Sequence, residues 1–319
     1  SLQRAIIDLG FENPTEVQEK AIPLLLEQET DLVALAQTGT GKTAAFGFPV
    51  IQKIDADNRN TQALILSPTR ELCLQITNEI KLYSKYEKGI NVVAVYGGAS
   101  ITEQARDIKR GAQIIVATPG RMQDMINRGL VNITQINYCI LDEADEMLNM
   151  GFYEDIVNIL STTPDEKSTW LFSATMPAEV ARIAKQFMHN PLEITVGTKN
   201  SGSATVSHEF YLVNARDRYE ALKRLADANP DIFSVVFCRT KRDTQQVAEK
   251  LIEDGYNAAA LHGDLSQAQR DSVMKSFRGR QIQMLVATDV AARGIDVDNV
   301  THVVNYQLPD EIETYNHRS

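Results

Sequence analysis

The sequence predicts an α/β protein of two domains, each a parallel sheet with helices on both faces. Short β-branched and apolar runs alternate with amphipathic segments along the chain, which is typical of parallel strands joined by crossover helices. The 319 residues are too many for one ordinary domain and suit two. An apolar content of 43% and a charged content of 23% are those of a globular protein with a sizeable core.

The predicted elements follow one another in a regular order. In the first half we expect helices at 71–84 and 101–110, and strands at 32–36, 63–67, 92–95, 114–117, 138–141 and 169–172. In the second half we expect helices at 241–254 and 267–277, and strands at 233–237, 258–261, 284–287 and 301–304.

A segment rich in Gly, Ser and Thr separates the two halves. Residues 196–210, VGTKNSGSATVSHEF, have no apolar periodicity and are typical of a linker. We therefore predict a first domain at 1–196, a linker at 197–207 and a second domain at 208–319. The alternative is one large sheet with a long loop.

Glycines, hydroxyls and charges follow directly after most of the predicted strands. In an open parallel sheet, ligands bind at the carboxyl ends of the strands. The candidate site residues therefore share one edge of each sheet.

Residues 34–46, ALAQTGTGKTAAF, place two glycines and a Lys-Thr pair between a predicted strand and a predicted helix. This is the setting of a P-loop, in which glycines let backbone N–H groups surround phosphate oxygens. Lys42 supplies a cation, Thr43 offers a hydroxyl to Mg²⁺, and the helix N-terminus adds positive charge. Ala36 stands where the strict pattern has Gly, and an ordinary turn is the alternative. The expected phosphate cradle is Thr38, Gly39, Thr40, Gly41, Lys42 and Thr43.

A second feature is the acidic run in YCILDEADEML at 138–148, which follows directly after the apolar strand predicted at 138–141. A buried strand would deliver Asp142 and Glu143 to the same sheet edge as Lys42. We expect Asp142 and Thr43 to hold the metal, and Glu143 to orient or deprotonate the attacking water. The catalytic candidates are Glu143, Asp142, Lys42 and Thr43; the alternative is a solvated acidic face.

The overall composition excludes several classes. A net charge of −10 disfavours nucleic-acid binding through a global basic field, so any such contact must use a local track of donors. The three cysteines form no CxxC pair and are expected in or beside core strands. No apolar stretch approaches a membrane span and no signal peptide opens the chain, so we expect a cytoplasmic protein with no membrane partner.

Taken together, the motifs resemble those of the helicase core of a bacterial-type DEAD-box ATP-dependent RNA helicase over nearly the whole chain. Any one motif is weak, but their order is specific. Along the chain they are GF at 10–11, PT at 14–15 with Gln18, AQTGTGKT at 36–43, PTREL at 68–72, GG at 97–98, TPGR at 118–121, DEAD at 142–145, SAT at 173–175, FCRTK at 237–241, QAQR at 267–270 and ATDVAARGID at 287–296.

The resemblance implies two tandem RecA-like (P-loop NTPase) domains, ATP and Mg²⁺ as cofactors, and RNA as partner. It implies an RNA-stimulated ATPase that couples ATP binding and hydrolysis to local unwinding or remodelling of RNA duplexes and RNA–protein complexes. No stable protein partner is predicted. Binding of ATP and RNA is expected to favour a closed domain arrangement that bends one RNA strand.

The same resemblance implies roles for individual residues. Phe11 would stack on adenine and Gln18 would hydrogen-bond its edges, while Asp296 would contact the ribose. Asp145, Ser173 and Thr175 would link ATP hydrolysis to strand separation. The implied contacts to the RNA sugar–phosphate backbone are Arg70, Gly98, Thr118 and Arg121 in the first domain and Arg239, Arg270, Thr288 and Arg293 in the second.

The chain departs from the family pattern at its end, ETYNHRS at 313–319. Family members continue with a glycine–arginine run that holds the arginine fingers. Such fingers are worth about 10³–10⁵ in rate. Because this sequence does not include that run, we expect the chain to bind ATP but to hydrolyse it weakly.

Three alternatives remain beside the helicase. Thr240 to Asp243 matches a guanine-specificity signature, but it lies far beyond the P-loop, so we assign it to the FCRTK motif. A DNA translocase of the same broad superfamily is disfavoured by the GF…Gln18 motif and by the Ala144–Asp145 ending. A non-catalytic, ATP-gated RNA clamp would carry the same motifs.

Overall fold

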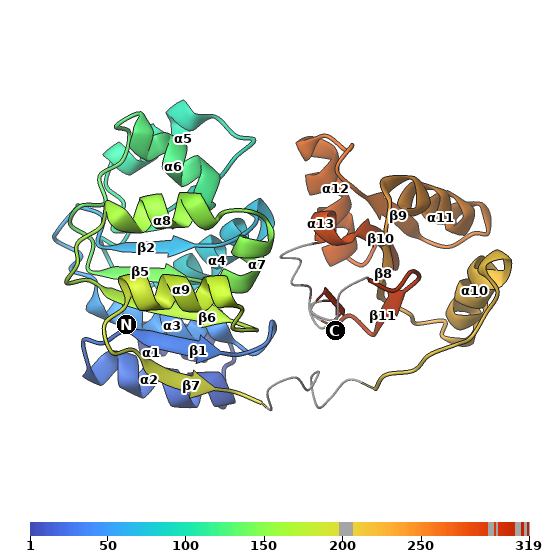
Figure 1. The fold of residues 1–319 in the computed structure, drawn as a ribbon, viewed down its shortest axis with the longest axis horizontal. Coiled ribbons are helices and arrows are strands. Elements are labelled where there is room, and N and C mark those ends of the chain that lie inside the picture. The colour runs from blue at the N-terminus through green and yellow to red at the C-terminus, as the bar shows by residue number, and fades with distance from the viewer. Residues whose placement is uncertain (198–206, 293–296, 298, 310–313, 316–317, 319) are drawn as a thin grey trace. The chain divides into compact units, whose positions relative to one another are not determined.

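The computed structural model describes residues 1–197, 207–292, 297, 299–309, 314–315 and 318. Its contacts divide the chain into two compact units, residues 1–199 and 200–319. Each unit is an open parallel sheet between helices (Figure 1).

The first unit holds a seven-stranded sheet in the order β3-β4-β2-β5-β6-β1-β7, and every neighbouring pair is parallel. Its strands are β1 (Leu32–Leu35), β2 (Ala63–Leu66), β3 (Val92–Val95), β4 (Ile114–Ala117), β5 (Tyr138–Leu141), β6 (Ser168–Ser173) and β7 (Leu192–Thr195). Its helices are α1 (Leu2–Asp8), α2 (Glu16–Glu27), α3 (Lys42–Lys53), α4 (Arg70–Tyr83), α5 (Ile101–Lys109), α6 (Pro119–Asn127), α7 (Ala144–Asn149), α8 (Tyr153–Ser161) and α9 (Ala178–Phe187).

Both faces of this sheet are buried, which explains the unbroken apolar runs of its strands. Successive side chains point to opposite faces: Ala34 packs with α1–α4, whereas Val33 packs with α5–α9. The order of the strands also positions the site. β6 lies between β1, which leads into the P-loop, and β5, which leads into the acidic motif.

The second unit repeats the design on a smaller sheet, in the order β11-β8-β10-β9. Its strands are β8 (Ser234–Cys238), β9 (Ala258–Leu261), β10 (Met284–Thr288) and β11 (His302–Asn305). Helices α10 (Arg218–Ala228) and α11 (Lys241–Glu253) cover one face. Helices α12 (Gln267–Arg278) and α13 (Asp289–Ala292) cover the other, and a short 3₁₀ turn, Ala215–Asp217, precedes α10.

The predicted α/β class with parallel sheets is confirmed, and every predicted strand is present within two residues of its expected ends. β7 was not anticipated. It is an edge strand whose residues are alternately half-buried and exposed, so LEIT carries no continuous apolar run. Most of the predicted linker lies outside the described residues, so the domain boundaries at 196 and 208 stay predictions.

The cysteines are placed as the sequence indicated. Cys139 lies in β5 and Cys238 in β8, while Cys73 lies on α4 with its thiol toward the carbonyls of Val95 and Val116 at the ends of β3 and β4. All three are buried and free, and burial raises the pKa of each thiol to about 12. They are inert core residues.

Candidate functional site

The P-loop connects β1 to α3, as its sequence setting predicted. Gly41 caps α3 with a φ of 85°, and a Cβ built there would lie 2.5 Å from Nε2 of Gln18. The backbone angle therefore favours glycine, and any larger residue would also displace the Gln18 amide. The Oγ1 of Thr40 donates to the carbonyl of Gln37 at 2.7 Å and closes the turn.

The acidic motif connects β5 to α7, and its two carboxylates lie beside the P-loop. Asp142 Oδ1 is 3.7 Å from Lys42 Nζ, and both side chains are buried. Thr38 Oγ1 donates to Glu143 Oε1 at 3.3 Å. The structure thus brings together Thr38 and Lys42, from the P-loop segment, and Asp142 and Glu143, from the connection that follows β5.

Burial sets the electrostatics of these carboxyl groups. Desolvation raises the pKa of Asp142, and the nearby Lys42 ammonium opposes that effect. Desolvation also raises the pKa of Glu143 to about 7, again against the attraction of Lys42. A carboxyl group whose pKa lies near neutral pH has the basicity suited to general acid–base catalysis.

Glu143 also has an unusual backbone. Its φ and ψ are both 51°, the left-handed region, and it caps the N-terminus of α7. A non-glycine residue in this region carries strain of about 1–3 kcal/mol, and such strain clusters at functional sites. The sequence offered no signal for this conformation.

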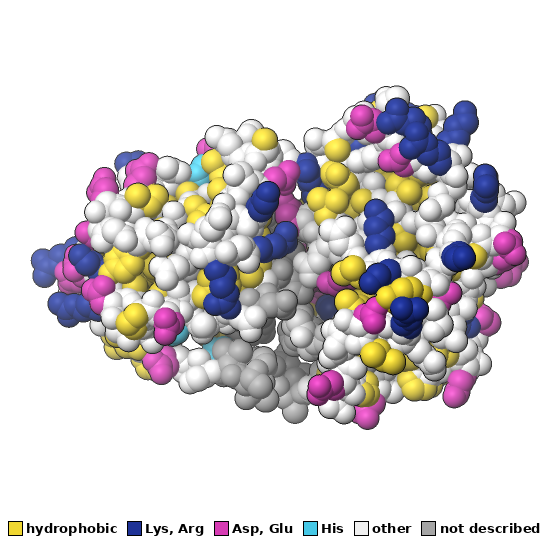
Figure 2. All heavy atoms as spheres, turned by 180° about the vertical axis from the view of Figure 1, so that it is seen from behind, with side chains coloured by type: hydrophobic (Ala, Val, Ile, Leu, Met, Phe, Trp, Pro, Cys, Tyr) yellow, Lys and Arg dark blue, Asp and Glu magenta, His cyan; other side chains and the backbone are white. Residues whose placement is uncertain are grey.

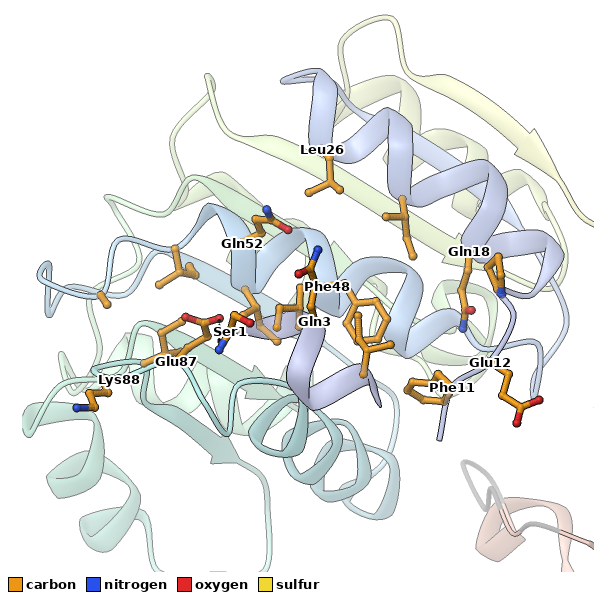
Figure 3. A pocket seen from close by; sticks show the side chains of 18 of the residues that line it. Ser1, Gln3, Phe11, Glu12, Gln18, Leu26, Phe48, Gln52, Glu87 and Lys88 are labelled. Atoms are coloured by element: carbon orange, nitrogen blue, oxygen red, sulfur yellow. Dashed lines mark ion pairs between the residues drawn. The ribbon is translucent and has the colours of Figure 1, made fainter. Parts of the chain in front are cut away.

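Gln18 lies against the P-loop, and Phe11 lies beside Phe48 of α3. Gln18 Oε1 accepts the N–H of Thr15 at 3.0 Å, and its Nε2 donates to the carbonyl of Gly41 at 3.1 Å. The ring of Phe11 is 45% exposed and lies 6.2 Å from the Phe48 ring. Both residues line a pocket of about 650 Å³, in which Figure 3 shows Phe11, Glu12 and Gln18 at one end.

The three proposed coupling residues meet at the end of β6. Asp145 Oδ2 accepts both the backbone N–H of Thr175 at 2.9 Å and its Oγ1 at 2.8 Å. The backbone N–H of Asp145 donates to Ser173 Oγ at 3.2 Å. Asp145 is 1% exposed and Thr175 is half-buried, so this link between α7 and the end of β6 is largely shielded from solvent.

The four RNA candidates of the first unit all follow strands at the carboxyl edge. Arg70 opens α4 after β2, Gly98 follows β3, and Thr118 caps α6 after β4. The guanidinium of Arg121, one turn into α6, donates to the carbonyl of Ala99 and to Gln104. These residues therefore lie at the carboxyl edge of the sheet, after the neighbouring strands β3, β4 and β2, and their contacts with RNA stay predictions.

In the second unit, Arg239 follows β8, Thr288 ends β10, and Arg270 lies in the first turn of α12 after β9. Arg239 is exposed and its Nε donates to the carbonyl of Leu308 at 2.8 Å. Arg293 and Asp296 lie outside the described residues, so their predicted roles stay predictions.

Thr240 and Asp243 have a structural role. Thr240 caps α11, its Oγ1 accepting the N–H of Asp243 at 3.0 Å and donating to Asp243 Oδ2 at 2.8 Å. Nearby, the buried guanidinium of Arg318 donates to both carboxylate oxygens of Asp289, at 2.5 and 2.6 Å. This ion pair holds Arg318 beside the end of β10, and nothing in the sequence indicated the pairing.

Among the described residues, no cluster of three or more His, Cys, Asp or Glu side chains could hold a metal ion. The donors present are the Asp142 carboxylate and the Thr43 hydroxyl, both hard oxygen ligands. That set fits Mg²⁺, which protein sites usually bind through one or two side chains together with substrate phosphates.

Figure 2 shows one face of the molecule, on which Lys and Arg side chains are interspersed with Asp and Glu side chains. Within the described parts of the chain, no helix has both the length and the apolar character that crossing a membrane requires.

The fold and the site together define a P-loop NTPase architecture with two tandem RecA-like units. Residues 15–183 match the family model "DEAD/DEAH box helicase", and residues 217–319 match "Helicase conserved C-terminal domain". The chain belongs to the DEAD/DEAH box helicase family.

Relatives and solved structures agree with this assignment. The chain is 48% identical to "ATP-dependent RNA helicase CshA" of Listeria monocytogenes, across 99% of its own length and 60% of that protein's. A solved structure, "S. cerevisiae Dbp5 bound to RNA and ADP BeF3", matches with a TM-score of 0.89 at 31% identity, across 99% of this chain and 82% of that one. A DEAD box protein from Methanococcus jannaschii matches at 45% identity with a TM-score of 0.61, across 99% and 85%. The chain spans 60% and 64% of the first two CshA relatives.

Proposed function

We propose that this chain is the core of an ATP-dependent RNA helicase, which couples ATP binding and hydrolysis to local separation of RNA duplexes. The observation that carries the proposal is the meeting of Lys42, Asp142 and Glu143 in one buried site. The named function of the CshA relatives supports it.

In this proposal, Gly39, Gly41 and the start of α3 surround the phosphates of ATP with backbone N–H groups. Lys42 neutralises the outer phosphates, and Asp142 and Thr43 hold Mg²⁺. When bound, that ion would neutralise charge on the β- and γ-phosphates. Glu143, whose pKa burial raises to about 7, takes a proton from the attacking water.

Recognition of adenine is assigned to Phe11 and Gln18. The half-exposed ring of Phe11, which lies beside Phe48 of α3 and lines the same pocket as Gln18, offers a stacking surface. The Gln18 side chain already donates a hydrogen bond to the carbonyl of Gly41. A base that hydrogen-bonds to the Gln18 amide would therefore affect the conformation of the phosphate cradle. Asp296 is proposed for the ribose, as the family resemblance implies.

RNA is proposed to lie along the carboxyl edges of the sheets. Arg70, Gly98, Thr118 and Arg121 would contact its backbone from the first unit, and Arg239, Arg270, Thr288 and Arg293 from the second. Such contacts hold the strand without reading its sequence. The pair of hydrogen bonds from Thr175 to Asp145 supports coupling, since it joins the proposed metal-binding segment to the end of β6.

The test is steady-state ATPase activity with no nucleic acid, with single-stranded RNA and with DNA of the same sequence, followed by unwinding of a short RNA duplex. We expect stimulation by RNA but not by DNA, and unwinding that requires ATP. Equal stimulation by DNA would favour the DNA translocase. Equal strand separation with ATP and with a non-hydrolysable ATP analogue would favour the non-catalytic, ATP-gated RNA clamp.

A further inference from the structure

We infer that Gln104 is a positioning residue for RNA binding, which it serves by fixing the exposed loop Tyr96–Ala99. This inference rests on the proposed function, because the loop carries Gly98, a proposed RNA contact. Gln104 lies on α5, is 6% exposed, and belongs to none of the family motifs described above.

The side chain of Gln104 holds the loop at its first residue. Its Nε2 donates to the carbonyl of Tyr96 at 3.1 Å, and its Oε1 accepts the N–H of the same residue at 3.4 Å. One amide therefore satisfies both backbone groups of Tyr96 just after β3 ends. Buried backbone groups need such partners, so the loop is anchored here.

Arg121 holds the other end of the loop. Its Nη1 and Nη2 donate to the carbonyl of Ala99 at 3.0 and 3.1 Å, and its Nη1 also donates to Gln104 Oε1 at 3.0 Å. Gln104 and Arg121 thus form one network of hydrogen bonds that holds both ends of a four-residue loop. We name this network the loop clamp.

The residues between the gripped ends face outward. Gly97 and Gly98 are exposed. Gly98 needs glycine for its φ of 82°, but Gly97 has no positive φ and no atom within 4 Å of a Cβ built there. Nothing in the described parts of the chain therefore requires glycine at 97. Glycine at 97 would also allow an external group to approach the backbone closely, and a nucleic-acid backbone would supply such a group.

The loop clamp also reaches Arg70. The guanidinium carbon of Arg70 lies 4.8 Å from the centre of the Tyr96 ring. A cation over an aromatic ring at this distance is attracted to it. Fixing Tyr96 therefore positions a second proposed RNA contact as well as Gly98.

The chain offers a matched control at the opposite end of the same strand. Gln113 is 1% exposed, and it too holds the backbone beside β3: its Oε1 accepts the N–H of Asn91 at 3.0 Å and its Nε2 donates to the carbonyl of Gly89 at 2.8 Å. It differs in lying at the amino edge of the sheet, away from the proposed RNA contacts.

The experiment compares Gln104→Met with Gln113→Met, because methionine keeps the length of the side chain and removes its polar atoms. Melting temperature, ATPase KM for ATP, and ATPase KM for a single-stranded oligoribonucleotide are measured for each. We expect both variants to lose melting temperature and to keep the KM for ATP. Only Gln104→Met should raise the KM for RNA, by about tenfold, as loss of loop positioning worth about 1.4 kcal/mol requires.

A second variant, Gln104→Glu, keeps an acceptor for Arg121 but loses the donor to Tyr96, so the RNA KM should rise less. This variant covers the case in which Gln104→Met does not fold. Equal RNA KM values for wild type and the Gln104 variants, or equal rises in the Gln104 and Gln113 variants, would overturn the inference. Absence of RNA stimulation in the wild type would instead overturn the proposed function.

Discussion

Asp145 and Thr175 are joined by two hydrogen bonds to a single oxygen: the backbone N–H and the Oγ1 of Thr175 both donate to Asp145 Oδ2. The pair joins the N-terminal turn of α7 to the end of β6. In the proposed mechanism, this link carries the state of the ATP site to the segment that follows β6.

Thr175→Val removes the side-chain bond and leaves the backbone bond intact. A hydrogen bond to a charged group contributes about 1.5–3 kcal/mol, so the coupling should weaken by about tenfold or more. We expect ATP hydrolysis to continue while the number of duplexes separated per ATP falls. Thr175→Ser keeps the hydroxyl and should behave as wild type; equal coupling in the Val and Ser variants would remove the hydroxyl from this role.

Glu143 gives a prediction about stability and pH. Its folded pKa, about 7, lies above its ordinary 4.5, so the folded protein holds a proton that the unfolded chain releases between these values. The stability that this proton contributes is complete below about pH 4.5 and is lost as the pH rises through 7. The rise in pKa corresponds to about 3 kcal/mol.

Glu143→Gln removes this ionisation and should abolish turnover while sparing ATP binding. By denaturant unfolding, we expect the variant to match wild type near pH 5. It should gain stability relative to wild type as the pH rises to 8, by up to about 3 kcal/mol. A stability difference that stays constant across this range would show that Glu143 ionises normally in the folded protein.

Gly41→Ala tests the phosphate cradle. The substitution forces alanine into a φ of 85° and sets its Cβ 2.5 Å from Gln18 Nε2, so the Gln18 amide must give up its bond to the Gly41 carbonyl or the loop must shift. We expect affinity for an ATP analogue to fall at least tenfold, as a cost of about 1–2 kcal/mol for the backbone alone implies.

Gly129→Ala is the control for this variant. Gly129 has a φ of 64° and no atom within 4 Å of a Cβ built there, so it shares the backbone cost without the collision. It should lose melting temperature and bind the analogue normally. Equal affinities in the two variants, measured by titration calorimetry, would contradict the role of Gly41.

Much of the fold was predictable because burial on both sheet faces leaves continuous apolar strands, such as ALIL in β2 and IIVA in β4. The P-loop and Asp142–Glu143 were predictable because each stands at a strand end. β7 was missed because the side chains of this edge strand are alternately half-buried and exposed, which leaves no continuous apolar run. The left-handed backbone of Glu143 and the grip of Gln104 on Tyr96 depend on tertiary contacts, which leave no local pattern in the sequence.

The proposed mechanism requires that the ATP site and the RNA site of this chain are energetically coupled. This coupling is measured as the affinity of Glu143→Gln for a labelled single-stranded RNA, by fluorescence anisotropy with and without ATP and Mg²⁺. We expect ATP to tighten RNA binding at least tenfold, and RNA to tighten ATP binding by the same factor. RNA affinity that is identical with and without ATP would contradict the proposed mechanism.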